Sequence, residues 1–454
     1  MKVCLIFPRI KYQPGDPPLG IIYVASELLK NKIDVDLIDL TFNPKKLDYI
    51  SEYFSKNKPD FAGIYFDTLM YNDGIKIINI IKQYNIPIIA GGPHSTVLPE
   101  SLTDHADAVV IGEGEKTFID LLNKYPKLEN VDGIVFKKNG KIIRNKPRQS
   151  AQNLDELNFP ALHLLDMENY IKNWHYLDSL DVGIRGTNLI ASRGCPFQCT
   201  YCQPTLDKLF GKKIRLRNPE NVIAELKLLK DKYNLGGFFL HDDTLTANHD
   251  WVKKFCDLLI KENLGMVWSC NTRVNTINEE LMKIMHEAGL RGFHLGVEAG
   301  SQRIVDEIYK KGIKLSEVKP VVDAAKKIGI HTLCFFMIGA PTETVKEINQ
   351  TIKFARSLKA DEATFSITSP LPHTGLHDYI TDRGYKLSDN FADFDYYSKR
   401  AFNDPNLPYK KLKRLQKKAL FLFYTHPYRW KYIMKHFASM KGIKKMMLKI
   451  SRFK

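Results

Sequence analysis

The sequence predicts an α/β protein with an N-terminal doubly wound, Rossmann-like domain, a partial barrel of six strand–helix units and a C-terminal helical segment. The first observation is that short apolar runs alternate with amphipathic stretches, as parallel strands alternate with helices. The second is an apolar fraction of 44% beside a charged fraction of 26%, which excludes disorder as the main state of these 454 residues. The third is a change of composition near the C-terminal end, where Lys and Arg collect.

The first five apolar runs have the length of strands that are covered on both faces. They occupy residues 3–8, 35–40, 61–66, 86–90 and 108–111. Helical spacing is found over residues 19–29, directly after two prolines, and again over residues 74–84. This alternation predicts a doubly wound parallel sheet, in which ligands bind at the carboxyl ends of the strands.

Two segments that follow predicted strands contain glycines that favour the close approach of a ligand. Their candidate residues are Gly91, Gly92, His94 and Ser95 after the fourth run, and Glu113 and Gly114 after the fifth. The alternative is that both segments are only tight strand-to-helix turns. The second segment is not expected to bind phosphate through a P-loop, because it lacks the required spacing and carries two glutamates.

Residues 131–146 are typical of a hairpin that turns at Asn139 and Gly140. We place the boundaries of the first domain at residues 1–146 and those of a linker at residues 147–184. The barrel then extends over residues 185–390. Residues 391–454 form the basic C-terminal helical segment.

Three of the seven cysteines, Cys195, Cys199 and Cys202, lie within eight residues of one another. Three thiolates on one loop can bind three irons of a [4Fe–4S] cluster and leave the fourth iron open to a substrate or cofactor. A structural zinc site is the alternative, but it requires four ligands, and the other four cysteines are scattered. The pattern does not indicate a secreted disulfide framework, and it favours a reducing compartment.

The spacing Cys-x3-Cys-x-aromatic-Cys, with Tyr201 before the last cysteine, resembles the signature of radical S-adenosylmethionine (SAM) enzymes. The resemblance extends from residue 185 to about residue 377. It implies that the open iron binds SAM and that an electron from the cluster cleaves SAM to methionine and a 5′-deoxyadenosyl radical. By the same resemblance, the SAM-binding residues are Tyr201, Asp242, Asp243, Arg273, Glu298, Gly339 and Pro341.

Each of these residues also has a structural alternative. Asp242 and Asp243 could cap a helix, Glu298 could be a structural acid, and Arg273 could be a salt-bridge partner within the barrel. The glycines could be plain turns. The order of the motifs after the cysteines favours the functional interpretation.

A doubly wound domain placed before such a barrel resembles the cobalamin-binding subclass of these enzymes. The resemblance implies a corrinoid held between the two domains. Its candidate residues are Leu19, Gly91, Gly92, His94, Ser95, Glu113 and Gly114. The motif Asp-x-His-x-x-Gly, which supplies a cobalt ligand in some cobalamin enzymes, is absent, so we expect His94 to be a turn residue near the corrin and not a ligand. The alternative is a degenerate domain that binds no cobalamin.

The resemblance implies an enzyme that transfers a methyl group to an unactivated carbon of a hydrophobic or lipid-like small molecule. It also implies a low-potential electron donor of the flavodoxin or ferredoxin type. An oxidative cyclase or carbon–carbon coupling enzyme is the first alternative. A tRNA methylthiotransferase would need a second set of N-terminal cysteines, and the first 180 residues contain only Cys4. A non-enzymatic zinc or corrinoid carrier would not need the barrel motifs in this order.

The net charge of +16 belongs almost entirely to the C-terminal segment. Residues 401–454 contain 15 Lys and Arg against one acid, Asp404, which gives +14 and leaves +2 for the rest of the chain. The segment could be a helical cap, a surface that docks on anionic lipid, or a nucleic-acid contact, of which the last is disfavoured. No apolar run reaches the ~18–20 residues of a membrane span, and the start does not resemble a signal peptide. We therefore expect a cytoplasmic protein, with a peripheral contact to the membrane through the basic segment as a further option.

Overall fold

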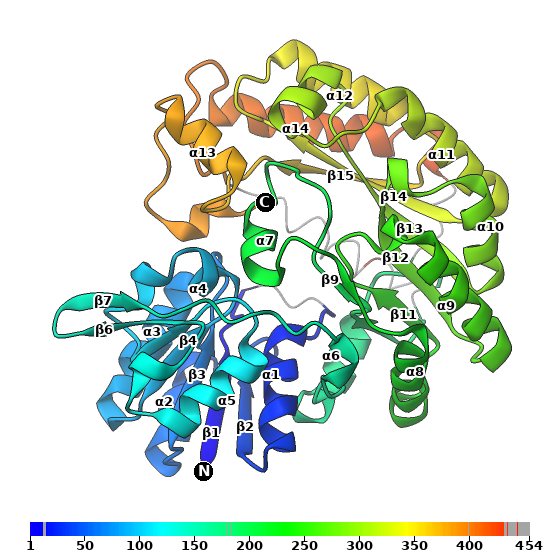
Figure 1. Cartoon of the computed structure of the whole chain (residues 1–454). Helices are drawn as coiled ribbons and strands as arrows, with labels where there is room; N and C mark the ends of the chain where they lie inside the picture. The colour runs from blue at the N-terminus through cyan, green and yellow to red at the C-terminus, as the bar shows by residue number, and fades with distance from the viewer. Residues whose placement is uncertain are drawn as a thin grey trace. The chain divides into compact units, whose positions relative to one another are not determined.

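The computed structural model describes residues 1–11, 15–178, 180–181, 183–397, 399–430, 434 and 443. The chain divides into two compact units. The first contains Met1–Asn173 and Thr205–Arg215, and the second contains Trp174–Pro204 and Leu216–Lys454. Residues of the predicted linker therefore occur in both units. Figure 1 shows the elements of each unit.

The first unit is built on a sheet of seven strands in the order β2-β1-β3-β4-β5-β6-β7. The strands are β1 (Lys2–Phe7), β2 (Asp34–Asp39), β3 (Phe61–Tyr65), β4 (Ile88–Gly91), β5 (Ala108–Val110), β6 (Ile134–Lys138) and β7 (Lys141–Arg144). The first five are parallel, and the strand order reverses between β1 and β3, as in other doubly wound sheets. The last two form the predicted hairpin, which pairs antiparallel with β5 and turns at Asn139 and Gly140, both at positive φ.

Helices cover this sheet on two faces. They are α1 (Leu19–Lys30), α2 (Leu47–Lys56), α3 (Tyr71–Ile81), α4 (Pro93–Val97), α5 (Gly114–Lys124), α6 (Met167–Asn173) and α7 (Thr205–Phe210). The residues of β1 alternate between the two sides: Cys4 and Ile6 pack in one core with α2 and α3, whereas Leu5 lies on the side of Phe118 in α5. The predicted helices at 19–29 and 74–84 are confirmed, and α2 was not predicted.

The second unit contains six parallel strands in the order β15-β14-β13-β12-β11-β8. They are β8 (Gly186–Leu189), β11 (Gly237–Leu240), β12 (Val267–Arg273), β13 (Leu290–Glu298), β14 (His331–Ile338) and β15 (Glu362–Ile367). The short strands β9 (Ser192–Arg193) and β10 (Arg215–Leu216) lie outside this sheet. The predicted series of six strand–helix units is therefore confirmed.

The helices of the second unit follow the strands along the outer side of the curved sheet (Figure 1). They are α8 (Pro219–Tyr233), α9 (His249–Glu262), α10 (Glu279–Glu287), α11 (Leu315–Ile328), α12 (Val345–Ser357), α13 (Gly375–Asp382) and α14 (Tyr409–Tyr424). Asn248 and Asn278 cap α9 and α10, and Thr344 with Glu347 forms a capping box at α12. These helices alternate with the strands, as the predicted strand–helix units require.

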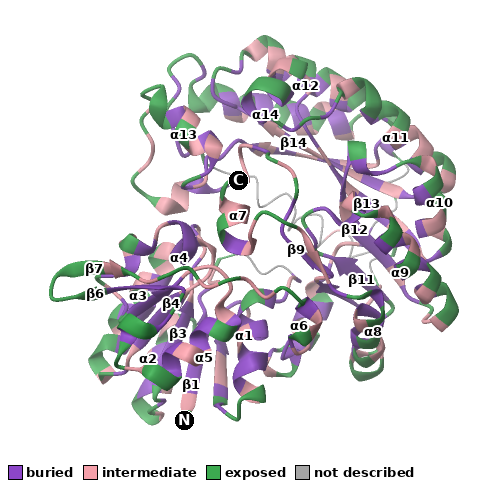
Figure 2. Cartoon of the chain, in the orientation of Figure 1, coloured by how far each residue is buried: buried purple, intermediate pink, exposed green. Residues whose placement is uncertain are grey.

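The alternation of burial along β14 identifies the inner face of the barrel. Thr332, Cys334, Phe336 and Ile338 are buried, and every second residue from His331 is only half-buried. The buried residues face the layer of helices, since α11 and α12 pack on β14. Figure 2 shows that the strands of this sheet are mostly buried, while exposed residues gather on the outer surfaces of the helices. The half-buried positions therefore line the concave inner face.

The basic C-terminal segment begins as a packed helix. Leu412, Leu415, Ala419 and Phe423 form the buried face of α14, which packs on β15 and α12. For α14 this supports the helical-cap interpretation. Most of the remaining tail, at 431–433, 435–442 and 444–454, lies outside the described residues, so the lipid contact stays a prediction. No helix in the described part of the chain has the length and apolar character needed to cross a membrane.

Arg217 fixes the chain just before the cysteine loop. Its Nη1 donates to the Ile190 carbonyl oxygen at 2.9 Å and to Glu225 Oε2 at 2.5 Å, and its backbone N–H donates to the Ala191 carbonyl at 2.8 Å. The Arg217 and Glu225 side chains are 5% and 2% exposed. The pair therefore joins α8 to the end of β8 in a site with almost no water.

We expect Arg217→Met to lower the free energy of unfolding by about 3–5 kcal/mol, because the Glu225 charge would stay buried without its partner. Urea unfolding followed by circular dichroism measures the change. The matched control is the double variant Arg217→Met/Glu225→Met, which removes both charges and should regain part of the loss. A double variant as unstable as the single one would contradict this account.

Candidate functional site

The cysteine loop leaves the carboxyl end of the barrel directly after β8 and β9. Cys195 and Cys199 are buried and Cys202 is half-buried. Cys195 Sγ lies 3.4 Å from Thr244 Oγ1, and Cys199 Sγ accepts a hydrogen bond from Arg273 Nη1 at 3.1 Å. Burial raises the pKa of the Cys195 and Cys202 thiols, so metal binding there has to release protons.

Arg273, the last residue of β12, contacts the loop in two ways. Its guanidinium lies 3.7 Å from the centroid of the Phe197 ring while it donates to Cys199, and it also donates to the Lys311 carbonyl oxygen. No acid pairs with Arg273 among the described residues, so it is not the salt-bridge partner that the structural alternative proposed. Its role is to place a charge-assisted hydrogen-bond donor beside a cysteine sulfur.

Tyr201, Glu298 and Lys311 form a second polar group beside the loop. Lys311 Nζ lies 2.6 Å from Glu298 Oε1 and 3.0 Å from the Tyr201 hydroxyl, which itself donates to Glu298 Oε1 at 3.1 Å. Glu298 ends β13 at φ 72°, where the register with β14 shifts. Lys311 was missed in the sequence, because nothing in a surface-like Lys-Lys-Gly stretch indicates that this ammonium is buried.

Asp242 and Asp243 have different environments after β11. Asp242 is buried and accepts from the Ala191 N–H at 3.1 Å and from Ser192 Oγ at 2.5 Å, so it anchors the start of the cysteine loop. Burial raises its pKa to about 6. Asp243 keeps access to solvent, although surrounding protein atoms raise its pKa to about 6 as well. Neither carboxylate caps a helix, because Thr244 and Asn248 occupy the cap positions that follow.

Gly339 and Pro341 form the turn after β14. Gly339 has φ 79°, and a Cβ there would come within 2.6 Å of Leu412 in α14. The Gly339 and Ala340 N–H groups donate to Glu343 Oε2 at 2.6 and 3.0 Å. This turn is thus fixed by contacts inside the protein. None of the hydrogen bonds of the described residues joins it to the cysteine loop.

The cobalamin candidates of the first unit differ in whether their side chains already have hydrogen-bond partners inside the protein. His94 is buried, with Nδ1 3.3 Å from Thr68 Oγ1 and Nε2 3.2 Å from Ser101 Oγ, and burial lowers its pKa to about 4. Both ring nitrogens therefore have partners inside the protein. By contrast, Ser95 Oγ is buried without a hydrogen-bond partner, and a Cβ on Gly91 would meet only Val110 at 3.9 Å.

Glu113 is engaged in the fold of the first unit. Its two carboxylate oxygens accept from Arg215 at 2.9 and 3.0 Å, and Oε2 also accepts from the Ala151 N–H at 3.1 Å. The bidentate pair attaches the segment Thr205–Arg215 to this unit. Leu19 and Gly114 are the first residues of α1 and α5, with Leu19 buried and Gly114 close to the side chain of Val24.

Comparisons with known proteins match two parts of the chain. The model of the radical SAM superfamily matches residues 189–355, and the model of the B12 binding domain matches residues 12–122. An uncharacterized methyltransferase of Pyrococcus horikoshii is 35% identical over 94% of this chain and 93% of its own length.

The chain belongs to the radical SAM superfamily and carries a B12-binding domain.

Other relatives of this B12-binding radical SAM enzyme carry out different reactions. The anaerobic magnesium-protoporphyrin IX monomethyl ester cyclase of Rubrivivax gelatinosus is 29% identical over 84% of this chain and 70% of its own length. The structure of the radical SAM methyltransferase TsrM from Kitasatospora setae, with cobalamin and a [4Fe–4S] cluster bound, has a TM-score of 0.77. It covers 92% of this chain and 90% of that one at 16% identity, which shows a shared fold.

The donor set of this radical SAM enzyme fits an iron–sulfur cluster. No three His, Cys, Asp or Glu side chains in the described ranges are grouped closely enough to hold one metal ion. A [4Fe–4S] cluster places each thiolate on a different iron, so its ligands do not converge on one point. Three thiols on one loop, with Arg273 donating to one sulfur, suit that arrangement.

Two neighbouring glycines of the B12-binding domain should respond differently to an added methyl group. Gly92 has φ +106°, and its Cβ would lie 2.6 Å from the Phe66 carbonyl oxygen. We expect Gly92→Ala to lower the free energy of unfolding by more than about 2 kcal/mol, through backbone strain and steric overlap. Gly91→Ala is the matched control and should cost less than about 1 kcal/mol. Thermal unfolding compares the two, and equal losses would contradict the assignment of strain to Gly92.

Proposed function

We propose that this enzyme uses a [4Fe–4S] cluster, SAM and cobalamin to transfer a methyl group to an unactivated carbon of a small hydrophobic or lipid-like molecule. The observation that carries the proposal is the connected group at the carboxyl end of the barrel. There the loop of three cysteines shares hydrogen bonds with Arg273 from β12 and, through Tyr201, with Glu298 from β13. The match to a B12-binding domain supports the use of cobalamin.

The cluster would be held by Cys195, Cys199 and Cys202 and would supply the electron that cleaves SAM. Arg273 donates to Cys199 Sγ, which offsets negative charge on that sulfur. Lys311 and Tyr201 both donate to Glu298 Oε1. Within the described part of the chain, Glu298 Oε2 has no hydrogen-bond donor. We assign this oxygen to the amino group of SAM.

SAM would also contact the turn at Gly339 and Pro341 and the carboxylate of Asp243. Asp242 instead positions the loop, because its carboxylate already accepts from Ala191 and Ser192. In the first unit, the free space beside Gly91 and the buried Ser95 hydroxyl, which has no hydrogen-bond partner among the described residues, would be available to a corrinoid, which would supply the methyl-transfer chemistry. His94 stays a residue near the corrin and not a cobalt ligand.

The inner face of the barrel supports an apolar substrate. Tyr176 stacks on Phe239 at 3.9 Å between ring centroids and on His294 at 5.5 Å. His294 in turn meets the half-buried Phe335 edge-on at 5.4 Å. These rings present aromatic surface on the concave side, where apolar and aromatic linings bind small molecules.

Oxidative cyclisation without net methyl transfer is the second candidate function. It is supported by the relative from Rubrivivax gelatinosus, which is a cyclase and matches 84% of this chain. Both candidates need the same electron supply, for which we propose a flavodoxin- or ferredoxin-type donor. In both, the cysteine loop would hold the cluster that supplies the electron for SAM cleavage.

Loss of one cluster ligand should abolish SAM cleavage. We expect Cys199→Ala to lower the iron content from about four per chain to a small fraction of that value and to remove 5′-deoxyadenosine formation. Anaerobic reconstitution, iron analysis and product chromatography measure both effects. The matched control is Cys256→Ala, which removes a buried thiol of α9 and should leave the iron content and cleavage in place. Retained cleavage in Cys199→Ala would overturn the proposal.

The products formed from SAM separate the two candidate functions. With reductant, substrate extract and cobalamin present, methyl transfer should yield S-adenosylhomocysteine together with 5′-deoxyadenosine. Both products are expected because one SAM molecule loses its methyl group while another SAM molecule is cleaved. A SAM labelled with deuterium in its methyl group allows the label to be followed by mass spectrometry. Cleavage to 5′-deoxyadenosine and labelled methionine alone would reject methyl transfer and favour the cyclase.

A further inference from the structure

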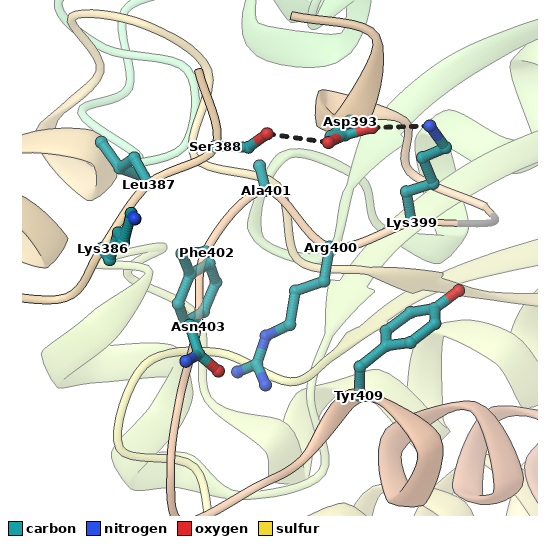
Figure 3. A pocket seen from close by; sticks show the side chains of 10 residues that line it. All are labelled: Lys386, Leu387, Ser388, Asp393, Lys399, Arg400, Ala401, Phe402, Asn403 and Tyr409. Atoms are coloured by element: carbon teal, nitrogen blue, oxygen red, sulfur yellow. Dashed lines mark hydrogen bonds and ion pairs between the residues drawn. The ribbon is translucent and has the colours of Figure 1, made fainter. Parts of the chain in front are cut away.

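A pocket of the second unit is lined by none of the candidate cluster or SAM residues. It has a volume of about 560 Å³ and is formed by the chain after α13, the segment before α14 and the first residue of α14. Figure 3 shows the side chains that line it, with Asp393 joined to Ser388 and to Lys399. The pocket is large enough for a small molecule.

The pocket has one cation more than its ion pairs compensate, because Arg400 pairs with the buried Asp404 and Lys399 pairs with Asp393. Lys386, Lys399 and Arg400 line it together with one acid, Asp393. Lys399 Nζ lies 2.6 Å from Asp393 Oδ1, so these two charges compensate each other. Among the described residues the Lys386 ammonium forms no ion pair, and it is exposed to the pocket and to solvent.

Arg400 supplies a buried donor without a partner. Its side chain is only 3% exposed. Nη1 donates to the Leu407 carbonyl at 2.6 Å, and Nη2 donates to the Gly339 carbonyl at 3.2 Å and lies 3.4 Å from Asp404 Oδ2. Nε has no hydrogen-bond partner among the residues that the structure describes. A buried guanidinium N–H in this state is unfavourable, and a bound acceptor would relieve it.

We propose that this pocket binds the anionic group of a small molecule, a carboxylate or a phosphate, through Lys386 and Arg400. Leu387 and Phe402 line the same pocket and would contact an apolar part of the ligand. The Arg400 guanidinium lies 4.1 Å from the centroid of the Phe402 ring, so charged and apolar surfaces adjoin. The ligand class is therefore an organic acid or phosphate with an apolar portion.

The position of Arg400 gives this pocket a connection to the barrel. The same guanidinium that lines the pocket holds the carbonyl of Gly339, in the turn after β14. A ligand that reorients Arg400 would alter the support of that turn. The proposal goes beyond the proposed function, because it requires neither a cluster nor cobalamin.

Calorimetry with two probes, inorganic phosphate and octanoate, tests the proposal on the full chain. We expect one saturable site per chain for each probe and no comparable binding of octanamide, which lacks the charge. Lys386→Gln should weaken both probes about five- to tenfold, as expected for the loss of one charge-assisted hydrogen bond. Lys353→Gln removes an equal charge from the exposed surface of α12 and is the matched control, which should stay within about twofold.

Three results would overturn the proposal: no saturable binding, equal weakening by both lysine variants, or octanamide binding as tightly as octanoate. The Lys386 ammonium is exposed and forms no ion pair with any described residue, so the variant should fold, and circular dichroism verifies this. The outcomes for the two proposals are separable. An enzyme that cleaves SAM but binds no anion rejects the pocket alone, whereas anion binding without cleavage rejects the proposed function alone.

Discussion

The Asp242 carboxylate is the interaction on which the position of the cysteine loop depends. It follows β11 but accepts from Ala191 and Ser192, which follow β8, so it joins the ends of two neighbouring parallel strands. A buried carboxylate is costly unless its oxygens are satisfied, and here the loop itself supplies the donors. If the loop moved away from the barrel, the buried carboxylate would lose its hydrogen-bond donors, which is unfavourable. The start of the loop that carries the three thiols is therefore held in place.

The same edge of the barrel balances the charges that this arrangement brings together. Arg273 donates to Cys199, and Lys311 pairs with Glu298 while it contacts Tyr201. These groups come from the loop after β8, the ends of β12 and β13 and the chain after β13, because the carboxyl ends of parallel strands meet at one edge. Buried ions are retained where partners lie within hydrogen-bond distance, which explains how two cations and a carboxylate can adjoin a sulfur-rich loop.

Much of this architecture could be predicted because its determinants are local. Apolar runs and amphipathic stretches predict individual strands and helices, and three cysteines within one loop indicate a cluster without any tertiary contact. The side-chain partners that were missed depend on tertiary contacts and not on a local pattern. Lys311 pairs with Glu298 only after a strand end and a helical turn are in place, and Arg215 returns to Glu113 across about a hundred residues. Residue type alone indicates nothing of such partners.

The B12-binding domain shows how far a motif can be transferred residue by residue. His94 and Glu113 have the chemistry of ligands, yet both side chains are satisfied inside the first unit, by Thr68 and Ser101 and by Arg215. Gly91, by contrast, has free space where a side chain would stand, and the Ser95 hydroxyl has no hydrogen-bond partner in the described part of the chain. The fold thus uses the strongly interacting side chains for its own stability. The domain therefore matches the B12-binding model although the ring nitrogens of His94 already have partners inside the protein.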